Sequence, residues 1–172
     1  MSSILTASTM NHVTKFAEIS DTVKHALKVA TQAHKGQFRF DGKPYITHPI
    51  AVANIVVEDG NLGAFTIDAI VAALLHDVVE DTPITLDDLE KEYFSPYQIH
   101  LVDCLSRRKG ESYTQFILRV ATDEVATKVK LADLKHNLSD LDKSQRRDKY
   151  ELATELLKLL VEKRKHNEYE RS

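Results

Sequence analysis

The chain has 172 residues, of which 42% are hydrophobic, and 23 basic against 26 acidic side chains give it a formal net charge of −3. This size suits one domain with a sizeable core, and the charge balance disfavours nonspecific nucleic-acid binding because it offers no broad cationic surface. Five glycines and four prolines are too few for the repeated tight turns of an all-β protein, so we expect an all-α fold.

Two helices with an irregular connection are expected before residue 60. Apolar side chains spaced by four and seven residues predict a first helix over about 20–35, capped by Asp21. Residues 37–47 contain an Asp-Gly pair and a proline, which favour a turn. A proline follows His48 and is typical of the first helical position, which places His48 at or beside the N-cap of a second helix over about 48–58.

The most apolar segment begins at Thr66 and predicts a central helix that Pro83 ends. A capping box then predicts a helix over about 85–94, and Ser95-Pro96 starts one that buries Cys104. The remaining apolar periodicity predicts helices over about 112–120, 123–138 and 148–163. We expect residues 1–172 to form one compact helical domain, with the first dozen residues and the tail beyond Lys163 loose.

Four polar side chains follow one another at the end of the central apolar segment. His76, Asp77, Glu80 and Asp81 are spaced so that, on one continuous helix, they occupy adjoining positions. Crowding three carboxylates at a buried helix end raises their ionisation cost, and a divalent cation offsets that cost directly. The alternative is that the acids simply face water, and this segment by itself leaves both interpretations open.

Two distant residues favour the metal interpretation. His48, at a helix start, and Asp133, on a helix with an apolar inner face, supply an imidazole and a carboxylate. Together with His76 and Asp77 they complete a mixed nitrogen and oxygen set suited to a divalent ion. A lone His48 is more typical of an N-cap or a surface residue.

The order His48, His76-Asp77, Asp133 resembles the H...HD...D signature of the HD-domain metal-dependent phosphohydrolases, an all-helical superfamily. The similarity extends to the hydrolase domain of Rel/SpoT-type alarmone enzymes and to stand-alone small alarmone hydrolases. It covers about residues 20–141, and the matching segments are Ala33–Arg39, Pro44–Pro49, Leu75–Thr82 and Val129–Asn137.

The resemblance implies one divalent ion, usually manganese in this family, held by His48, His76, Asp77 and Asp133. Glu80 and Asp81 match the family's acidic pair, which orients or deprotonates the attacking water. Members of the family split the 3′-pyrophosphate from guanosine tetra- or pentaphosphate. That chemistry suits the groups present, because a divalent ion activates water and a nearby carboxylate takes its proton.

The resemblance also implies a nucleotide site. Arg39 matches an arginine that lies against the purine base, while Tyr45 and Asn137 match positions lining the nucleotide. Several residues depart from the family pattern: Phe40 stands where a lysine is common, Leu134 and Lys135 replace the usual Arg-Leu pair, and Asp140 stands where a threonine near the substrate is frequent. We expect Asp140 to repel a nearby pyrophosphate, which makes the substrate less certain than the reaction class.

Other polar residues have plainer interpretations. His34 and His136 are expected to be structural, His34 on the inner face of the first helix. The run Arg107–Lys109 is typical of a solvated loop, although a phosphate-rich substrate could use it if the loop folds over the metal.

Two classes of function therefore stay open. The first is a metal-dependent nucleotide hydrolase, removing the 3′-pyrophosphate from (p)ppGpp or a (p)ppApp-like alarmone, or acting as a phosphatase on another nucleotide such as NADPH. The second is a noncatalytic nucleotide-binding scaffold, which has no need for both the ligand set and the adjacent acids. From the length we expect no fused synthetase domain. The expected partner is a small-molecule nucleotide, and a homo-oligomer stays open.

The single cysteine and the absence of an apolar run of about 20 residues predict no internal disulfide and no membrane association. A cytoplasmic setting is therefore expected.

Overall fold

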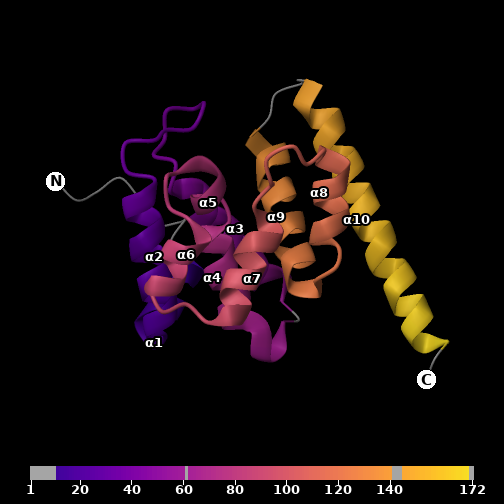
Figure 1. The fold of residues 1–172 in the computed structure, drawn as a ribbon, viewed down its shortest axis with the longest axis horizontal. Helices are drawn as coiled ribbons and strands as arrows, with labels where there is room; N and C mark the ends of the chain where they lie inside the picture. The colour runs from indigo at the N-terminus through magenta and orange to yellow at the C-terminus, as the bar shows by residue number, and fades with distance from the viewer. Residues whose placement is uncertain (1–10, 61, 141–144, 171–172) are drawn as a thin grey trace.

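The computed structural model describes residues 11–60, 62–140 and 145–170. Over these residues the fold is all-α, as predicted, and an isolated antiparallel bridge pairs Phe38 with Pro44. The helical elements are α1 (Asn11–Ile19), α2 (Asp21–Ala33), α3 (Thr47–Asp59), the short 3₁₀ helix η1 (Gly63–Phe65), α4 (Thr66–Leu75), α5 (Val78–Asp81), α6 (Leu86–Lys91), α7 (Pro96–Leu105), α8 (Tyr113–Val120), α9 (Glu124–Asp140) and α10 (Gln145–Tyr169). Figure 1 shows α1 and α2 at one end of the molecule and α8, α9 and α10 at the other.

The central helix is α4, which is apolar on every side. Residues 69–75 are completely buried, and the helix packs against α2, α3, α7 and α9. A helix that is hydrophobic all round is stable only inside a core, so the sequence of α4 dictates its place. Because α4 ends at Leu75, it delivers the following residues, His76 and Asp77, to the middle of the fold.

The prediction of one helix from Thr66 to Pro83 is wrong in its second half. The helix stops at Leu75, His76 and Asp77 form a turn, and α5 covers only Val78–Asp81. The His76 ring bonds the Ala73 carbonyl through Nδ1 (2.8 Å). A side chain bonded to a carbonyl of the preceding turn competes with the helical ladder, which accounts for the break. The adjoining positions expected on one continuous helix are therefore replaced by a turn that faces inward.

The capping box predicted at Thr85 is confirmed, and the helices that begin after Ser95 and Ser112 have the same motif. Thr85, Ser95 and Ser112 each accept from a backbone N–H three residues on, and each receives the reciprocal side-chain bond that completes a capping box. Reciprocal caps satisfy two otherwise unpaired backbone donors. Cys104 is buried in α7, as expected.

Two expected helix starts need correction. Ser20 caps α2 in place of Asp21, because its side chain accepts from the Val23 N–H (3.4 Å). His48 lies inside the first turn of α3, which begins at Thr47, and the Thr47 hydroxyl bonds the Pro44 carbonyl (2.8 Å). The prediction did not include α1 or η1, and residues 1–10 of the segment expected to be loose lie outside the described residues.

The last helix is longer than expected. Helix α10 continues to Tyr169, so the prediction of a loose tail beyond Lys163 is wrong for residues 164–169. The Arg164 guanidinium bonds the Ala121 carbonyl at the end of α8, which holds this part of α10 against the body. Within the described part of the chain, no helix combines the length and the hydrophobicity needed to cross a membrane.

Candidate active site

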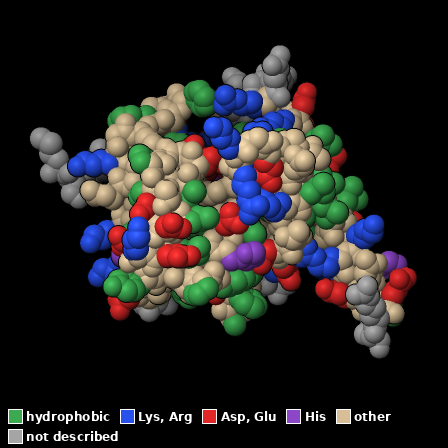
Figure 2. Space-filling model, viewed as in Figure 1, with side chains coloured by type: hydrophobic (Ala, Val, Ile, Leu, Met, Phe, Trp, Pro, Cys, Tyr) green, Lys and Arg blue, Asp and Glu red, His purple; other side chains and the backbone are tan. Residues whose placement is uncertain are grey.

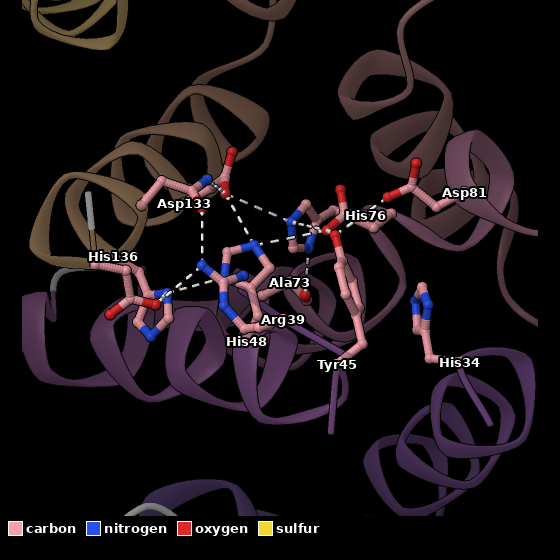
Figure 3. Close-up of polar contacts among 12 residues, drawn as sticks. His34, Arg39, Tyr45, His48, Ala73, His76, Asp81, Asp133 and His136 are labelled. Atoms are coloured by element: carbon pink, nitrogen blue, oxygen red, sulfur yellow. Dashed lines mark hydrogen bonds and ion pairs between the residues drawn. The ribbon is translucent and has the colours of Figure 1, made fainter. Parts of the chain in front are cut away.

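Four side chains expected to bind a metal converge at the centre of the molecule, as Figure 3 shows for His48, His76 and Asp133. His48 comes from α3, His76 and Asp77 from the turn after α4, and Asp133 from α9. His48 Nε2 lies 3.1 Å from Asp133 Oδ1 and 3.5 Å from Asp77 Oδ2. His76 Nε2 lies 3.1 Å from Asp77 Oδ2 and 3.7 Å from Asp133 Oδ1. Segments far apart in the sequence thus meet in one cluster of two nitrogens and two oxygens, of which the atoms of His48, His76 and Asp77 lie close enough together to hold a metal ion.

The tautomer of His76 fits a metal ligand. Its Nδ1 faces the Ala73 carbonyl, which can only accept, so Nδ1 carries the ring proton. His76 Nε2 is buried and faces the carboxylates of Asp77 and Asp133. Burial alone lowers the pKa of His76, but the two carboxylates raise it to about 10, which measures how strongly this position attracts a positive charge. A divalent cation satisfies the same demand.

A second histidine supports His48. His136 Nδ1 lies 2.9 Å from His48 Nδ1, so one ring donates and the other accepts. Burial, followed by the neighbouring His48, lowers the pKa of His136 to about 4. A neutral His136 is able to accept from His48 Nδ1–H, and that arrangement turns His48 Nε2 toward Asp133. His136 is thus structural, as expected, and it sets the orientation of a candidate ligand.

Asp133 is held ionised by its surroundings. Burial raises its pKa, but Lys130, whose Nζ lies 2.7 Å from Oδ2, and the two histidines hold the pKa well below its usual value. Asn137 Nδ2 donates to the other oxygen, Oδ1 (2.6 Å). Both carboxylate oxygens of Asp133 therefore have fixed partners, and its charge is compensated on one side by a buried lysine.

Tyr45 joins the ligand set to one of the acids expected in catalysis. Its hydroxyl lies within donor distance of Asp77 Oδ2 (2.7 Å) and of Asp81 Oδ2 (3.1 Å). Burial and the charge of Asp77 raise the pKa of Asp81. The Glu80 carboxylate accepts from the backbone N–H of Arg107 (3.0 Å). Both acids thus stay beside the centre, although the helix expected to present them is broken.

A pocket of ≈ 630 Å³ opens over this cluster, a size typical of small-molecule sites. His48, Asp77 and Asp133 line it, together with Glu80 and Asp81. Besides Arg39, four basic side chains line it, from three separate parts of the chain: Arg107, Lys130, Arg146 and Lys149. Figure 2 shows Lys and Arg side chains gathered in the upper middle of the viewed face.

The expected nucleotide residues Arg39, Tyr45 and Asn137 all line the pocket. Arg39 Nη2 donates to Asn137 Oδ1 (3.3 Å) and to Asp140 Oδ2 (2.9 Å). The turn at residues 41–42 that brings Arg39 back is present, because Arg39 N–H bonds the Lys43 carbonyl (2.9 Å). Asp140 therefore shares its charge with Arg39 and does not present an unpaired negative charge to the pocket.

Several lining residues were not predicted. Lys130 could have been found from its spacing of three residues before Asp133, which places the two charges on one helix face. Arg146 and Lys149 belong to α10, whose sequence pattern gave no sign that its first turns close over a pocket. Of the run 107–109, Arg107 lines the pocket, while Arg108 pairs with Asp103 (2.7 Å).

His34 lies at the edge of the cluster. The ring is buried against Tyr45, with the ring centroids 4.7 Å apart, and its Nδ1 is 2.8 Å from Gln37 Oε1. It thus supports the ring whose hydroxyl reaches Asp77 and Asp81, in agreement with the structural role expected from the sequence.

Comparison with known protein families identifies the class. Residues 26–115 match the family model described as "HD domain", and this span includes His48, His76 and Asp77. The chain belongs to the HD domain family.

Curated relatives sharpen the comparison within that family. The chain is 42% identical over 125 residues to a probable GTP pyrophosphokinase of Mycobacterium leprae, an alignment that covers 67% of this chain and 15% of the relative. It is 37% identical over 142 residues to a guanosine-3′,5′-bis(diphosphate) 3′-pyrophosphohydrolase of Haemophilus influenzae (76% and 20% covered), and 34% identical over 148 residues to the bifunctional (p)ppGpp synthase/hydrolase SpoT of Escherichia coli (80% and 20% covered). The chain spans a fifth or less of the length of these relatives.

A solved structure of a metazoan SpoT ortholog, described as a protein that hydrolyzes ppGpp and plays a role in starvation responses, is also similar to this chain. It is 29% identical to this chain, with a TM-score of 0.66. The match covers 80% of this chain and 84% of the other. The similarity to Rel/SpoT-type proteins expected from the sequence is confirmed.

Proposed function

We propose that this protein is a metal-dependent hydrolase that removes the 3′-pyrophosphate from (p)ppGpp or a (p)ppApp-like alarmone. The observation that carries the proposal is the convergence of His48, His76, Asp77 and Asp133 beneath a nucleotide-sized pocket. A structural ion-pair cluster has no need of a pocket above it or of acids beside it. The similarity to a solved SpoT ortholog that hydrolyzes ppGpp supports the same conclusion.

In this proposal one divalent ion, Mn²⁺ by family resemblance, is held by His48, His76, Asp77 and Asp133. When bound, such an ion lowers the pKa of coordinated water and offsets the charge of phosphoryl oxygens. The protein's part is to orient both rings through the Ala73 carbonyl and His136, so that Nε2 of each histidine faces the position of the ion.

Asp81 and Glu80 act on the attacking water in this scheme. Asp81 shares the Tyr45 hydroxyl with Asp77, so it lies beside the ligand set, and its raised pKa suits a proton acceptor. Glu80, fixed by the backbone N–H of Arg107, orients the water. Attack on the phosphorus next to the 3′-oxygen breaks that P–O bond, and the 3′-oxygen leaves with a proton.

The substrate side of the pocket suits a polyanion. Arg107, Lys130, Arg146 and Lys149 present positive charge above the ligand set, and Arg39 offers a planar guanidinium toward a base. Because the proposed substrates are nucleotides used inside the cell, we place the activity in the cytoplasm.

The test is an assay of chelator-stripped protein reloaded with Mn²⁺, Mg²⁺ or Zn²⁺ against ppGpp, pppGpp, ppApp and NADPH. We expect ppGpp to yield GDP and pyrophosphate with Mn²⁺. Glu80→Gln should keep the metal and lose turnover, while Glu162→Gln, an exposed change on α10, should keep both. Tight metal binding without hydrolysis of any nucleotide would contradict the proposal and favour a noncatalytic scaffold.

A further inference from the structure

A second, smaller hollow adjoins the main pocket and has the composition of a base-reading site. Its volume is ≈ 130 Å³, and it shares Arg39, Phe40 and Asn137 with the larger pocket. Tyr150 also lines both, while Asp140 lines only the smaller one. The smaller hollow therefore joins flat side chains to two carboxylates, Asp140 and Asp41, beside the site proposed for the phosphates, and Asp41 is paired with Lys43 (2.6 Å).

Phe40 supplies an unusual exposed ring at this position. It is 93% exposed although it is fully apolar, and the Arg146 guanidinium lies 5.6 Å from its ring centroid. Exposure of an apolar ring to water is unfavourable, whereas stacking of a flat heterocycle on the ring is favourable. The wall of the hollow is therefore suited to a base.

Asp140 is placed to read the edge of that base. Its Oδ2 accepts from Arg39 (2.9 Å), and no hydrogen bond from a described residue reaches its Oδ1. Arg39 in turn bonds Asn137, and Asn137 bonds Asp133 (2.6 Å). This series of bonds fixes the position of the Asp140 carboxylate relative to the proposed metal site.

We infer that Asp140 reads the Watson–Crick edge of the substrate base and makes the site select guanine over adenine. This inference rests on the proposed function of the same pocket. An ionised carboxylate only accepts hydrogen bonds, and guanine presents two donors side by side on this edge, N1–H and the exocyclic N2–H. Adenine places an acceptor, N1, against the same oxygens, and this mismatch weakens its binding relative to guanine.

The competing role for Asp140 is to anchor Arg39 only. The two roles make different predictions for Asp140→Asn, because an amide offers one acceptor and one donor. That pattern loses a bond to guanine and matches adenine, which has an acceptor at N1 and a donor at N6. An anchor for Arg39, in contrast, affects both bases equally.

The experiment measures kcat/KM for ppGpp and ppApp with the Mn²⁺-loaded protein, and the dissociation constants of GDP and ADP by calorimetry. We expect the wild type to prefer guanine by roughly tenfold to a hundredfold, the range for one well-placed bidentate contact. Asp140→Asn should reduce that preference at least tenfold in both measurements, with a gain for the adenine ligand. Asp148→Asn, an exposed change at the start of α10, is the matched control and should keep the preference.

Equal losses for both bases in Asp140→Asn, or a wild type without base preference, would overturn the inference. The calorimetric comparison separates this outcome from failure of the proposed function. If the wild type hydrolyses neither alarmone but binds GDP over ADP in a manner that depends on Asp140, the proposed function fails and the base-reading role stands.

Discussion

Replacing Lys130 with Met tests how the protein keeps a buried carboxylate ready for a cation. Lys130 Nζ lies 2.7 Å from Asp133 Oδ2, and the two side chains are only 12% and 5% exposed. The amine also lies 5.0 Å from the centroid of the Phe116 ring. Methionine keeps most of the volume packed on that ring and removes the charge.

Removal of one partner from a buried ion pair costs about 3–5 kcal/mol, because the remaining charge is left uncompensated. Asp133 limits this cost by taking up a proton, so the lower part of the range is expected. For a protein of this size a loss of about 3 kcal/mol lowers Tm by roughly 6–12 °C. The loss applies to the protein kept in a chelator, where no metal substitutes for the lysine.

The assay is urea and thermal unfolding of the wild type, Lys130→Met, Asp133→Asn and the double variant, each with chelator and with excess Mn²⁺. The double variant should be more stable than the sum of the single losses predicts, because no lone charge remains. Mn²⁺ should stabilise Lys130→Met more than the wild type, since it supplies the missing positive charge. Lys158→Met, at an exposed position of α10, should change stability by less than about 0.5 kcal/mol.

A loss under about 1 kcal/mol for Lys130→Met, or additive losses in the double variant, would refute this reasoning. Either result would mean that Asp133 does not depend on Lys130 for its charge.

Three further results are expected. His136→Ala should weaken Mn²⁺ binding, measured by calorimetry, roughly tenfold to a hundredfold, because His48 loses the acceptor that orients it. Helix content should not change. An unchanged Mn²⁺ affinity would show that the contact between the two rings has no such role. Tyr45→Phe should lower kcat roughly tenfold while retaining metal, since Asp81 loses a hydroxyl donor; equal loss of metal would point to a purely structural role. The raised pKa of His76, about 10 against 6.5 unfolded, adds stability that is fully present below pH 6.5 and lost as pH rises toward 10. In chelator, the urea midpoint should therefore fall as pH rises from 6.5 toward 10 while Mn²⁺ affinity rises, and a flat midpoint would contradict this assignment.

Local signals in the sequence predicted most of the fold. The capping boxes at Thr85, Ser95 and Ser112 are set by residues three positions apart, so the sequence contains all the information they need. The central place of α4 follows from its continuous apolar sequence. The break after Leu75 was not predictable in this way, because it depends on a side-chain bond from His76 to the backbone inside a crowded core.

The candidate site also has features that were predictable from the sequence and features that were not. The order of His48, His76-Asp77 and Asp133 pointed to one cluster, and the structure brings these side chains together. The contact between His48 and His136 joins residues 88 positions apart, and the sequence showed both only as separate polar residues. Long-range packing of α3 against α9 creates that contact, so it could be known only from the fold.

The net charge of the chain gave no indication of the positive charge around the pocket. A chain of net charge −3 has no broad cationic surface, yet the fold gathers Arg107, Lys130, Arg146 and Lys149 from distant segments around one opening. Burial and the nearby charges of Arg107 and Lys130 lower the pKa of Lys149, so the ammonium is held in an environment that disfavours positive charge. An anion entering the pocket relieves that repulsion and gains the attraction of all four groups at once. The positive charge of these side chains is therefore concentrated above His48, Asp77 and Asp133, where an anion with several phosphates benefits most.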